Sequence, residues 1–206
     1  MDQLSARINS LPVSETLAMA AKARELKNKG IDIIGLSLGE PDFNTPEFIK
    51  DAAIQAIKDN YNSYSPVDGY ADLKEAICTK FKRDNNLNYS PSQIVVSTGA
   101  KQSIANICMV LLDPGDEVLL PAPYWVSYSA IATLAEATSI IIPSSIKTDF
   151  KITPEQLEAF ITPKTKLVMF NSPNNPSGTI YTEAEYRALG KVLEKYPDIF
   201  ILSDEI

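Results

Sequence analysis

Histidine is absent from the 206 residues of the chain, and cysteine occurs only twice. Without histidine, the chain cannot form Ser–His or Cys–His nucleophile pairs, or a metal site with an imidazole ligand. Cys78 and Cys108 lie in helix-like segments among apolar neighbours, so we expect two buried thiols rather than a disulfide or a metal pair. No metal site is expected. Any enzymatic chemistry must therefore come from Asp, Glu, Lys, Tyr or Ser side chains, or from a bound cofactor.

Long apolar runs and an excess of positive charge are missing as well. No segment approaches the roughly 20 apolar residues that a membrane-spanning helix needs, and the N-terminus lacks the apolar core of a signal peptide. The net charge of −7 disfavours a nucleic-acid partner bound through its phosphates. Hydrophobic residues make up 45% of the chain, which is typical of a globular protein. Together these features lead us to expect a cytoplasmic globular protein with neither a membrane nor a nucleic-acid partner.

Short apolar segments alternate with segments of helical period along most of the chain. Helices are expected between the predicted strands, which lie at residues 93–97, 117–121, 138–143, 166–171 and 199–203. This alternation predicts a mostly parallel sheet covered by helices on both faces, which is a three-layer α/β fold. Residues 1–45 lack the alternation, so we assign them to a separate N-terminal arm or part-domain.

Three predicted helices bear on the later argument. The helix at residues 100–112 is almost wholly apolar, so it should be buried. Another helix is predicted at residues 123–135, which contain the only tryptophan. The helix at residues 153–161 opens with a threonine, a proline and a glutamate, a typical start signal.

Parallel sheets bind ligands at the carboxyl ends of their strands, so the residues that follow each strand are the candidates. Gly99 follows the first predicted strand and precedes a helix, an arrangement that suits a phosphate, although a plain strand-to-helix turn explains it equally. Neither a Walker pattern nor a dinucleotide fingerprint accompanies it. Trp125 follows the second strand, either as a core aromatic or as a surface on which a flat ring stacks.

Amide and carboxylate side chains follow the last two strands. The segment SPNNPSG contains more asparagine than one turn needs, a cis X–Pro bond is expected there, and Asn175 can donate to a phenolate or a carboxylate. Asp204 ends a buried strand, where a carboxylate needs a partner. That partner is a protonated ring nitrogen, unless Asp204 caps a helix or forms a structural ion pair. Together these groups match pyridoxal 5′-phosphate, an electron-sink cofactor.

Five segments carry a family resemblance: GEPDFNTP, STGAKQ, PYWVSY, NSPNNPSG and SDEI. The order and spacing of these segments resemble those of class I aminotransferases of pyridoxal-phosphate fold type I. The resemblance is greatest to bacterial aspartate aminotransferases of the compact type. The resemblance covers essentially the whole chain. It implies that residues 1–45 are an N-terminal arm and part of the small domain, and that residues 46–206 are the first part of the large cofactor-binding domain.

The resemblance also implies roles for the residues at the strand ends. The backbone at Gly99, Ala100 and Lys101 would hold the cofactor phosphate. Trp125 would stack on the cofactor ring and contribute to the substrate site. Asp204 would be the catalytic residue that pairs with the ring nitrogen.

Four further positions complete the expected site. Asn175 would bind the ring oxygen and lie near the substrate carboxylate, and Asn171 would line the same strand end as a cofactor-binding residue. The backbone of Gly39 would meet the substrate. Tyr64 would reach the phosphate of the neighbouring subunit in a homodimer, unless it is an ordinary loop aromatic.

The implied reaction is transfer of an amino group between an L-amino acid, with aspartate as the leading choice, and a 2-oxo acid, 2-oxoglutarate. By resemblance, the Schiff-base lysine and the arginine that binds the substrate carboxylate lie beyond residue 206. We therefore expect the 206 residues to be part of a longer enzyme and inactive alone. Pro12 stands where prephenate-using relatives tend to carry lysine, which disfavours prephenate.

Several alternatives stay open at this point. Aromatic and kynurenine aminotransferases share most of the five segments, and pyridoxal-phosphate lyases and cyclopropane-forming synthases share the fold. A non-catalytic regulator with an aminotransferase-like domain is an alternative of another class, although such proteins carry a DNA-binding module upstream. An ordinary nucleotide-binding α/β domain would need the glycine-rich fingerprint that is absent.

Overall fold

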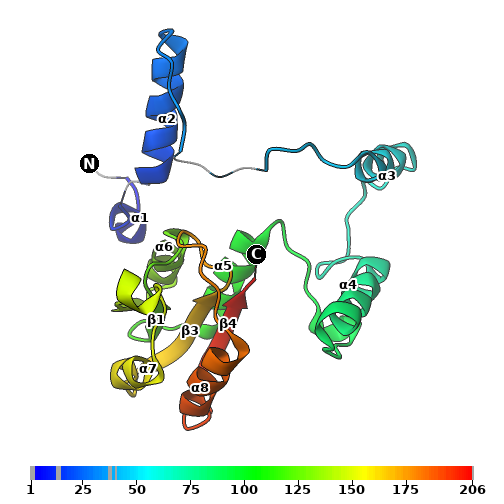
Figure 1. Cartoon of the computed structure of the whole chain (residues 1–206). Coiled ribbons are helices and arrows are strands. Elements are labelled where there is room, and N and C mark those ends of the chain that lie inside the picture. The colour runs from blue at the N-terminus through cyan, green and yellow to red at the C-terminus, as the bar shows by residue number, and fades with distance from the viewer. Residues whose placement is uncertain (1–2, 13–14, 37–38, 40, 206) are drawn as a thin grey trace. The chain divides into compact units, whose positions relative to one another are not determined.

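The computed structural model describes residues 3–12, 15–36, 39 and 41–205, and it contains two compact units (Figure 1). One unit comprises residues 1–12 and 98–206, and the other comprises residues 13–97. The predicted domain boundary at residues 45/46 does not coincide with this division. It stays a prediction about the domains of the whole protein.

A four-stranded parallel sheet forms the centre of the first unit. Its strands stand in the order β2-β1-β3-β4, and their bounds are β1 (Glu117–Pro121), β2 (Thr138–Ile142), β3 (Thr165–Asn171) and β4 (Phe200–Asp204). The chain leaves β1 toward one side of the sheet, and then continues from β3 toward the other side. The strand order therefore reverses between β1 and β3, where a parallel sheet opens a crevice beyond its carboxyl ends.

Helices cover both faces of this sheet (Figure 1). Successive strand residues point to opposite faces, so Val118 and Leu120 pack with one layer while Leu119 packs with the other. The first layer contains α5 (Ala100–Leu111) and α6 (Ser127–Leu134), and the second contains α7 (Pro154–Phe160) and α8 (Glu183–Leu193). The predicted three-layer α/β fold with a parallel sheet is confirmed.

Local signals explain where the helices of the second layer begin. Thr153 caps α7 by accepting from the N–H of Gln156, and the Gln156 side chain accepts from the N–H of Thr153 in return. Thr182 and Glu185 form the same reciprocal pair at the start of α8. Each such cap stabilises a helix by about 1 kcal/mol. The start signal predicted for residues 153–161 is confirmed.

The first unit also contains two short helices, α1 (Ala6–Asn9) and η2 (Ile146–Thr148), whereas all elements of the second unit are helical. The elements of the second unit are α2 (Glu15–Asn28), α3 (Glu47–Lys58), α4 (Ala71–Asn85) and the 3-10 turn η1 (Pro91–Gln93). The strand predicted at residues 93–97 is wrong. An extended segment becomes a strand only where a neighbour completes the hydrogen-bond ladder. Among the described residues, the N–H groups of Gln93 and Ile94 bond only to the adjacent turn, and a single backbone bond, from the N–H of Val96 to the carbonyl of Asp68, reaches a more distant segment.

Burial of α5 and of the cysteines differs from expectation. In α5, Ile104 and Cys108 are buried, but Met109 and Val110 are exposed because only one side of the helix faces the sheet. The expectation of a wholly buried helix is therefore wrong. Burial raises the pKa of the Cys108 thiol to about 11. Cys78 is only half-buried, so one of the two predicted buried thiols is confirmed. None of the helices in the described part of the chain is both long and apolar enough to cross a membrane.

Gly69 generates a stability prediction for the second unit. Its φ of +101° lies in the region that favours glycine, and an added Cβ would lie 2.5 Å from Cγ2 of Val96. We expect Gly69→Ala to lower the free energy of unfolding by about 2 kcal/mol or more, because both strain and overlap result. Chemical denaturation of the full-length protein measures the loss.

Gly190 provides the matched control for this substitution. It lies inside α8, and an added Cβ meets no described atom within 4 Å. Gly190→Ala should leave stability unchanged or raise it by about 0.5–1 kcal/mol. Equal losses in the two variants would contradict the assignment of strain to Gly69.

An ion-pair network at the start of α8 predicts a dependence of stability on pH. Hydrogen bonds from the Lys151 ammonium, 2.8 Å away, and from the N–H of Thr182 lower the pKa of Glu185 from 4.5 to about 2. A carboxyl with a lowered pKa in the folded state stabilises the fold above its unfolded pKa, and this contribution disappears as pH falls through the folded value. Glu185→Gln should therefore lose stability above pH 4.5, and its difference from the parent should shrink as pH falls toward 2 and vanish below it.

Unfolding of the full-length protein at a series of pH values tests this expectation. Glu183→Gln is the control, because Glu183 lies in the same first turn with its side chain 79% exposed. Identical pH profiles for the parent and Glu185→Gln would show that the network does not stabilise the fold.

Candidate active site

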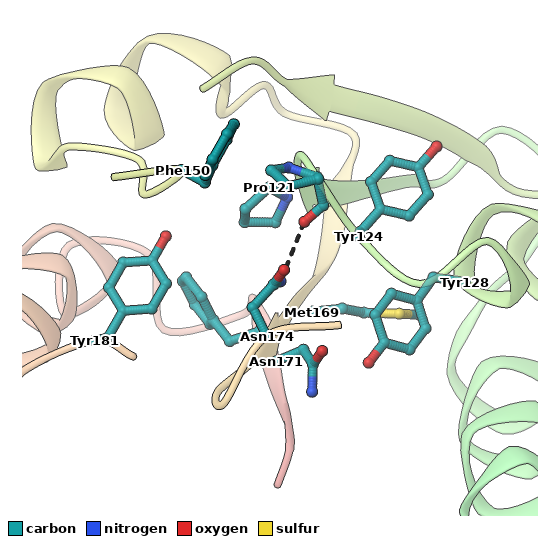
Figure 2. Close-up of a pocket in the computed structure, with 10 residues that line it drawn as sticks. Pro121, Tyr124, Tyr128, Phe150, Met169, Asn171, Asn174 and Tyr181 are labelled. Carbon is teal, nitrogen blue, oxygen red and sulfur yellow. Dashed lines mark hydrogen bonds between the residues drawn. The ribbon is translucent and has the colours of Figure 1, made fainter. Parts of the chain in front are cut away.

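The candidate residues of the first unit gather at the carboxyl ends of the strands. The loop after β1 contains Trp125, the loop after β3 contains Asn175, and β4 itself ends with Asp204. A small cavity of about 10 Å³ lies between these loops (Figure 2). It has room for about one water molecule and is too small for an organic ligand. The residues that line this cavity show how the loop after β1 and the loop after β3 are held together.

Three asparagines lie at the end of β3 and in the loop after it. The side chains of two form hydrogen bonds within the protein, and the third does not. The Asn174 amide donates to the carbonyl of Pro123 at 3.1 Å, across to the loop after β1 (Figure 2). Its oxygen accepts from the N–H and the hydroxyl of Ser177. Asn174 therefore joins the two loops. The expected cis bonds are present at Ser172–Pro173 and Asn175–Pro176.

Asn171 joins the ends of β3 and β4. Its side chain is 4% exposed, donates to the carbonyl of Asp204 at 2.9 Å, and accepts from the N–H of Asn175 at 2.6 Å. The Asn175 side chain itself is exposed and has no hydrogen-bond partner among the described residues. Of the three amides, only that of Asn175 is free to meet a ligand. The role of Asn171 in holding a cofactor stays a prediction.

Tyr128 links the two residues that were expected to contact a cofactor ring. Its hydroxyl donates to Oδ2 of Asp204 at 2.5 Å. Its ring packs edge-on against Trp125, with centroids 5.5 Å apart and planes at 90°. Trp125 and half-buried Asp204 thus both contact one buried phenol. Burial, followed by the hydrogen bond and the charge of Asp204, raises the pKa of Tyr128, so the hydroxyl stays protonated and continues to donate.

The start of α5 offers a site for an anion. Gly99 has a φ of +85°, and an added Cβ would meet no atom within 4 Å, so the backbone there is open to a close approach. The N–H groups of Ala100 and Lys101 find no acceptor within the described part of the chain. The Lys101 ammonium lies 4.8 Å from the centre of the Trp125 ring, which brings positive charge beside the aromatic surface.

Tyr128 was missed by the sequence reasoning, although a signal for it exists. The helix predicted from residue 123 begins only at Ser127, and the N–H of Tyr128 bonds to the carbonyl of Trp125. This tight turn brings side chains three residues apart to the same side. A second aromatic three residues after a candidate stacking ring is therefore the pattern that would have found it.

Gly39 and Tyr64 belong to the other unit, and their roles stay predictions. The Tyr64 side chain is fully exposed, and Gly39 has open space around its Cα. Within the described residues, the acidic side chains and cysteines form no cluster of three or more that would suit a metal ion.

The fold is of the α/β class, and the candidate ligand site lies at the reversal of strand order. The chain belongs to the aminotransferase class I and II family, whose pattern it matches over residues 31–206. The resemblance found in the five sequence segments is thereby confirmed.

Similar proteins support this membership in sequence and in structure. The chain is 52% identical over 204 residues to an aspartate/prephenate aminotransferase of Nitrosomonas europaea, covering 99% of this chain and 51% of that protein. It is 50% identical to an aspartate aminotransferase of Bacillus subtilis, covering 99% of this chain and 52% of that one. The chain thus spans about half the length of the curated relatives it matches.

Solved structures agree closely with the fold. The crystal structure of an aspartate aminotransferase from Rhizobium meliloti matches with a TM-score of 0.94 at 46% identity, over 98% of this chain and 50% of that one. An aspartate aminotransferase from Thermus thermophilus, solved with maleate, matches with a TM-score of 0.95 at 39% identity, over 100% of this chain and 54% of that one.

Adjacent Asn174 and Asn175 allow a paired prediction. Asn174→Ala should destabilise the full-length protein by about 1–3 kcal/mol, because half-buried partners in both loops lose their hydrogen bonds. Asn175→Ala should leave the free energy of unfolding within about 0.5 kcal/mol of the parent and weaken ligand binding instead. Denaturation and cofactor titration of both variants measure the two effects, and the reverse pattern would refute this division of roles.

Proposed function

We propose that the protein containing this chain is a pyridoxal-phosphate-dependent aminotransferase that moves an amino group between L-aspartate and 2-oxoglutarate. The observation that carries the proposal is the contact of one side chain, Tyr128, with both Asp204 and Trp125. A carboxylate and an aromatic surface, both in contact with one phenol, are the groups that a cationic, flat heterocycle requires. Family membership and the names of the relatives support the same reaction.

The residues present fit this cofactor in their chemistry. Oδ1 of Asp204 has no partner among the described residues, and Oδ2 has only Tyr128, so the half-buried carboxylate has an acceptor to offer. The open backbone at Gly99 and the N–H groups of Ala100 and Lys101 suit a phosphate. The unbonded amide of Asn175 suits an anionic oxygen.

Each of these residues would have a distinct task in the reaction. When bound, pyridoxal phosphate supplies an electron sink for the charge that develops as the substrate loses its α-proton. Asp204 would hold a proton on the ring nitrogen, and Trp125 would orient the ring by stacking on it. Asn175 would donate to the ring oxygen and to the substrate carboxylate, and the backbone from Gly99 to Lys101 would anchor the phosphate.

The remaining parts of the site would come from outside the described chain. We place the lysine that moves the α-proton, and the arginine that binds the substrate carboxylate, in the part of the protein that the 206 residues do not include. Residues 1–45 would form the N-terminal arm and part of the small domain, and residues 46–206 the first part of the large domain. In a homodimer Tyr64 would contact the phosphate of the other subunit, and the backbone of Gly39 would contact the substrate.

A dicarboxylate substrate is favoured by the names of the relatives and by the ligand of one solved structure. Aspartate occurs in the names of the Nitrosomonas and Bacillus proteins, and the Thermus enzyme was solved with maleate, itself a dicarboxylate. Prephenate occurs in the Nitrosomonas name and is the second candidate. Exposed Pro12 stands where prephenate users are expected to carry lysine, so we propose weak use of prephenate.

Turnover of aspartate by the full-length protein tests the proposal. Purified protein should produce glutamate from aspartate and 2-oxoglutarate, and Asp204→Ala should lower kcat by about 100-fold or more, because a preorganised charge is lost. Glu205→Gln, at the exposed neighbouring position, is the control and should keep the parent rate. A parent protein that binds the cofactor but transfers no amino group from any amino acid would favour the non-catalytic regulator.

Substitution at Pro12 separates the two substrate candidates. Pro12→Lys should raise kcat/KM for prephenate and leave that for aspartate within about 2-fold, since an added cation favours the second carboxylate of a larger dicarboxylate. Steady-state kinetics with both substrates provide the measurement. Efficient prephenate turnover by the parent protein would refute the role given to Pro12.

A further inference from the structure

We propose that Tyr128 is a positioning residue that holds the Asp204 carboxylate by Oδ2 and leaves Oδ1 to accept the ring N–H of the cofactor. This inference rests on the proposed function, because it concerns the same site. It assigns a task to a residue that is buried at the carboxyl end of the sheet and that the proposed reaction does not otherwise use.

The geometry gives Tyr128 control over one part of Asp204 only. The main chain of Asp204 is already held, because its carbonyl accepts from the Asn171 amide at 2.9 Å and from the N–H of Ser172 at 3.3 Å. Within the described residues, the carboxylate accepts a single hydrogen bond, the one from the Tyr128 hydroxyl at 2.5 Å. Removing that hydroxyl would therefore free the rotation of the carboxylate without releasing the strand that carries it.

Tyr128 itself is held firmly enough to act as an anchor. Its side chain is 1% exposed and belongs to the core layer of α5 and α6. Its ring is fixed on one side by the edge-on contact with Trp125. Because the same phenol contacts the stacking surface and the carboxylate, it sets the position of one relative to the other.

The hydrogen bond persists through neutral pH. Burial raises the pKa of the Tyr128 phenol, so its hydroxyl stays protonated and continues to donate to Oδ2 of Asp204.

A cofactor analogue separates this role from a merely structural one. In 1-deaza-pyridoxal phosphate, a C–H replaces the ring nitrogen, so the analogue has no N–H for Oδ1 of Asp204 to accept. Loss of a positioning contact should weaken binding of pyridoxal phosphate alone. Loss of general packing should weaken both ligands equally.

The experiment titrates the full-length protein, freed of cofactor, with each ligand in turn. Tyr128→Phe should raise the Kd for pyridoxal phosphate about 10-fold, the effect of losing one hydrogen bond to a charged group, and change the Kd for the deaza analogue by less than about 2-fold. Tyr196→Phe is the control, because the Tyr196 ring packs in the other core layer and its hydroxyl has no hydrogen-bond partner among the described residues. It should change neither Kd.

Three results would overturn the inference. Equal weakening of both ligands by Tyr128→Phe would make Tyr128 a packing residue, and unchanged binding of both would remove its influence on Asp204. A crystal structure of Tyr128→Phe in which the Asp204 carboxylate keeps its parent orientation would also show that Tyr128 does not position it. Failure of the parent protein to bind pyridoxal phosphate at all is a separate outcome, since it overturns the proposed function and this inference together.

Discussion

The parallel register between β3 and β4 is the constraint on which the rest of the candidate site depends. It sets Asn171 opposite Asp204, and the Asn171 amide then bonds both to the Asp204 carbonyl and to the N–H of Asn175. A shift of one residue would turn every side chain of β4 to the other face of the sheet. The Asp204 carboxylate would then point away from Tyr128 and from the layer that contains Trp125.

The polar groups around this register fall into two kinds. Asn171, Asn174 and Tyr128 have their hydrogen bonds satisfied inside the protein, and they hold strand ends and loops in place. The side chain of Asn175 and Oδ1 of Asp204 have no hydrogen-bond partner among the described residues. Buried polar groups need partners, so the bonded set is structural and the unbonded set is available for chemistry.

Much of this arrangement follows from local sequence patterns. The apolar segments that became β1 to β4, and the capping pairs that start α7 and α8, were predicted because strand length and capping depend on near neighbours. The segment at residues 93–97 failed for the opposite reason. Its composition suits a strand, but pairing depends on a neighbour that composition does not reveal.

The sequence by itself determined the class of fold, the family, and the identity of candidates such as exposed Asn175 and half-buried Asp204. Only the tertiary structure decided which of the three amides is free and that Tyr128 bonds to a carboxylate 76 positions away. The physical reason is that hydrogen bonds between strand ends depend on register and on the order β2-β1-β3-β4. These are properties of how distant segments meet, whereas caps and periodicity are properties of neighbours along the chain.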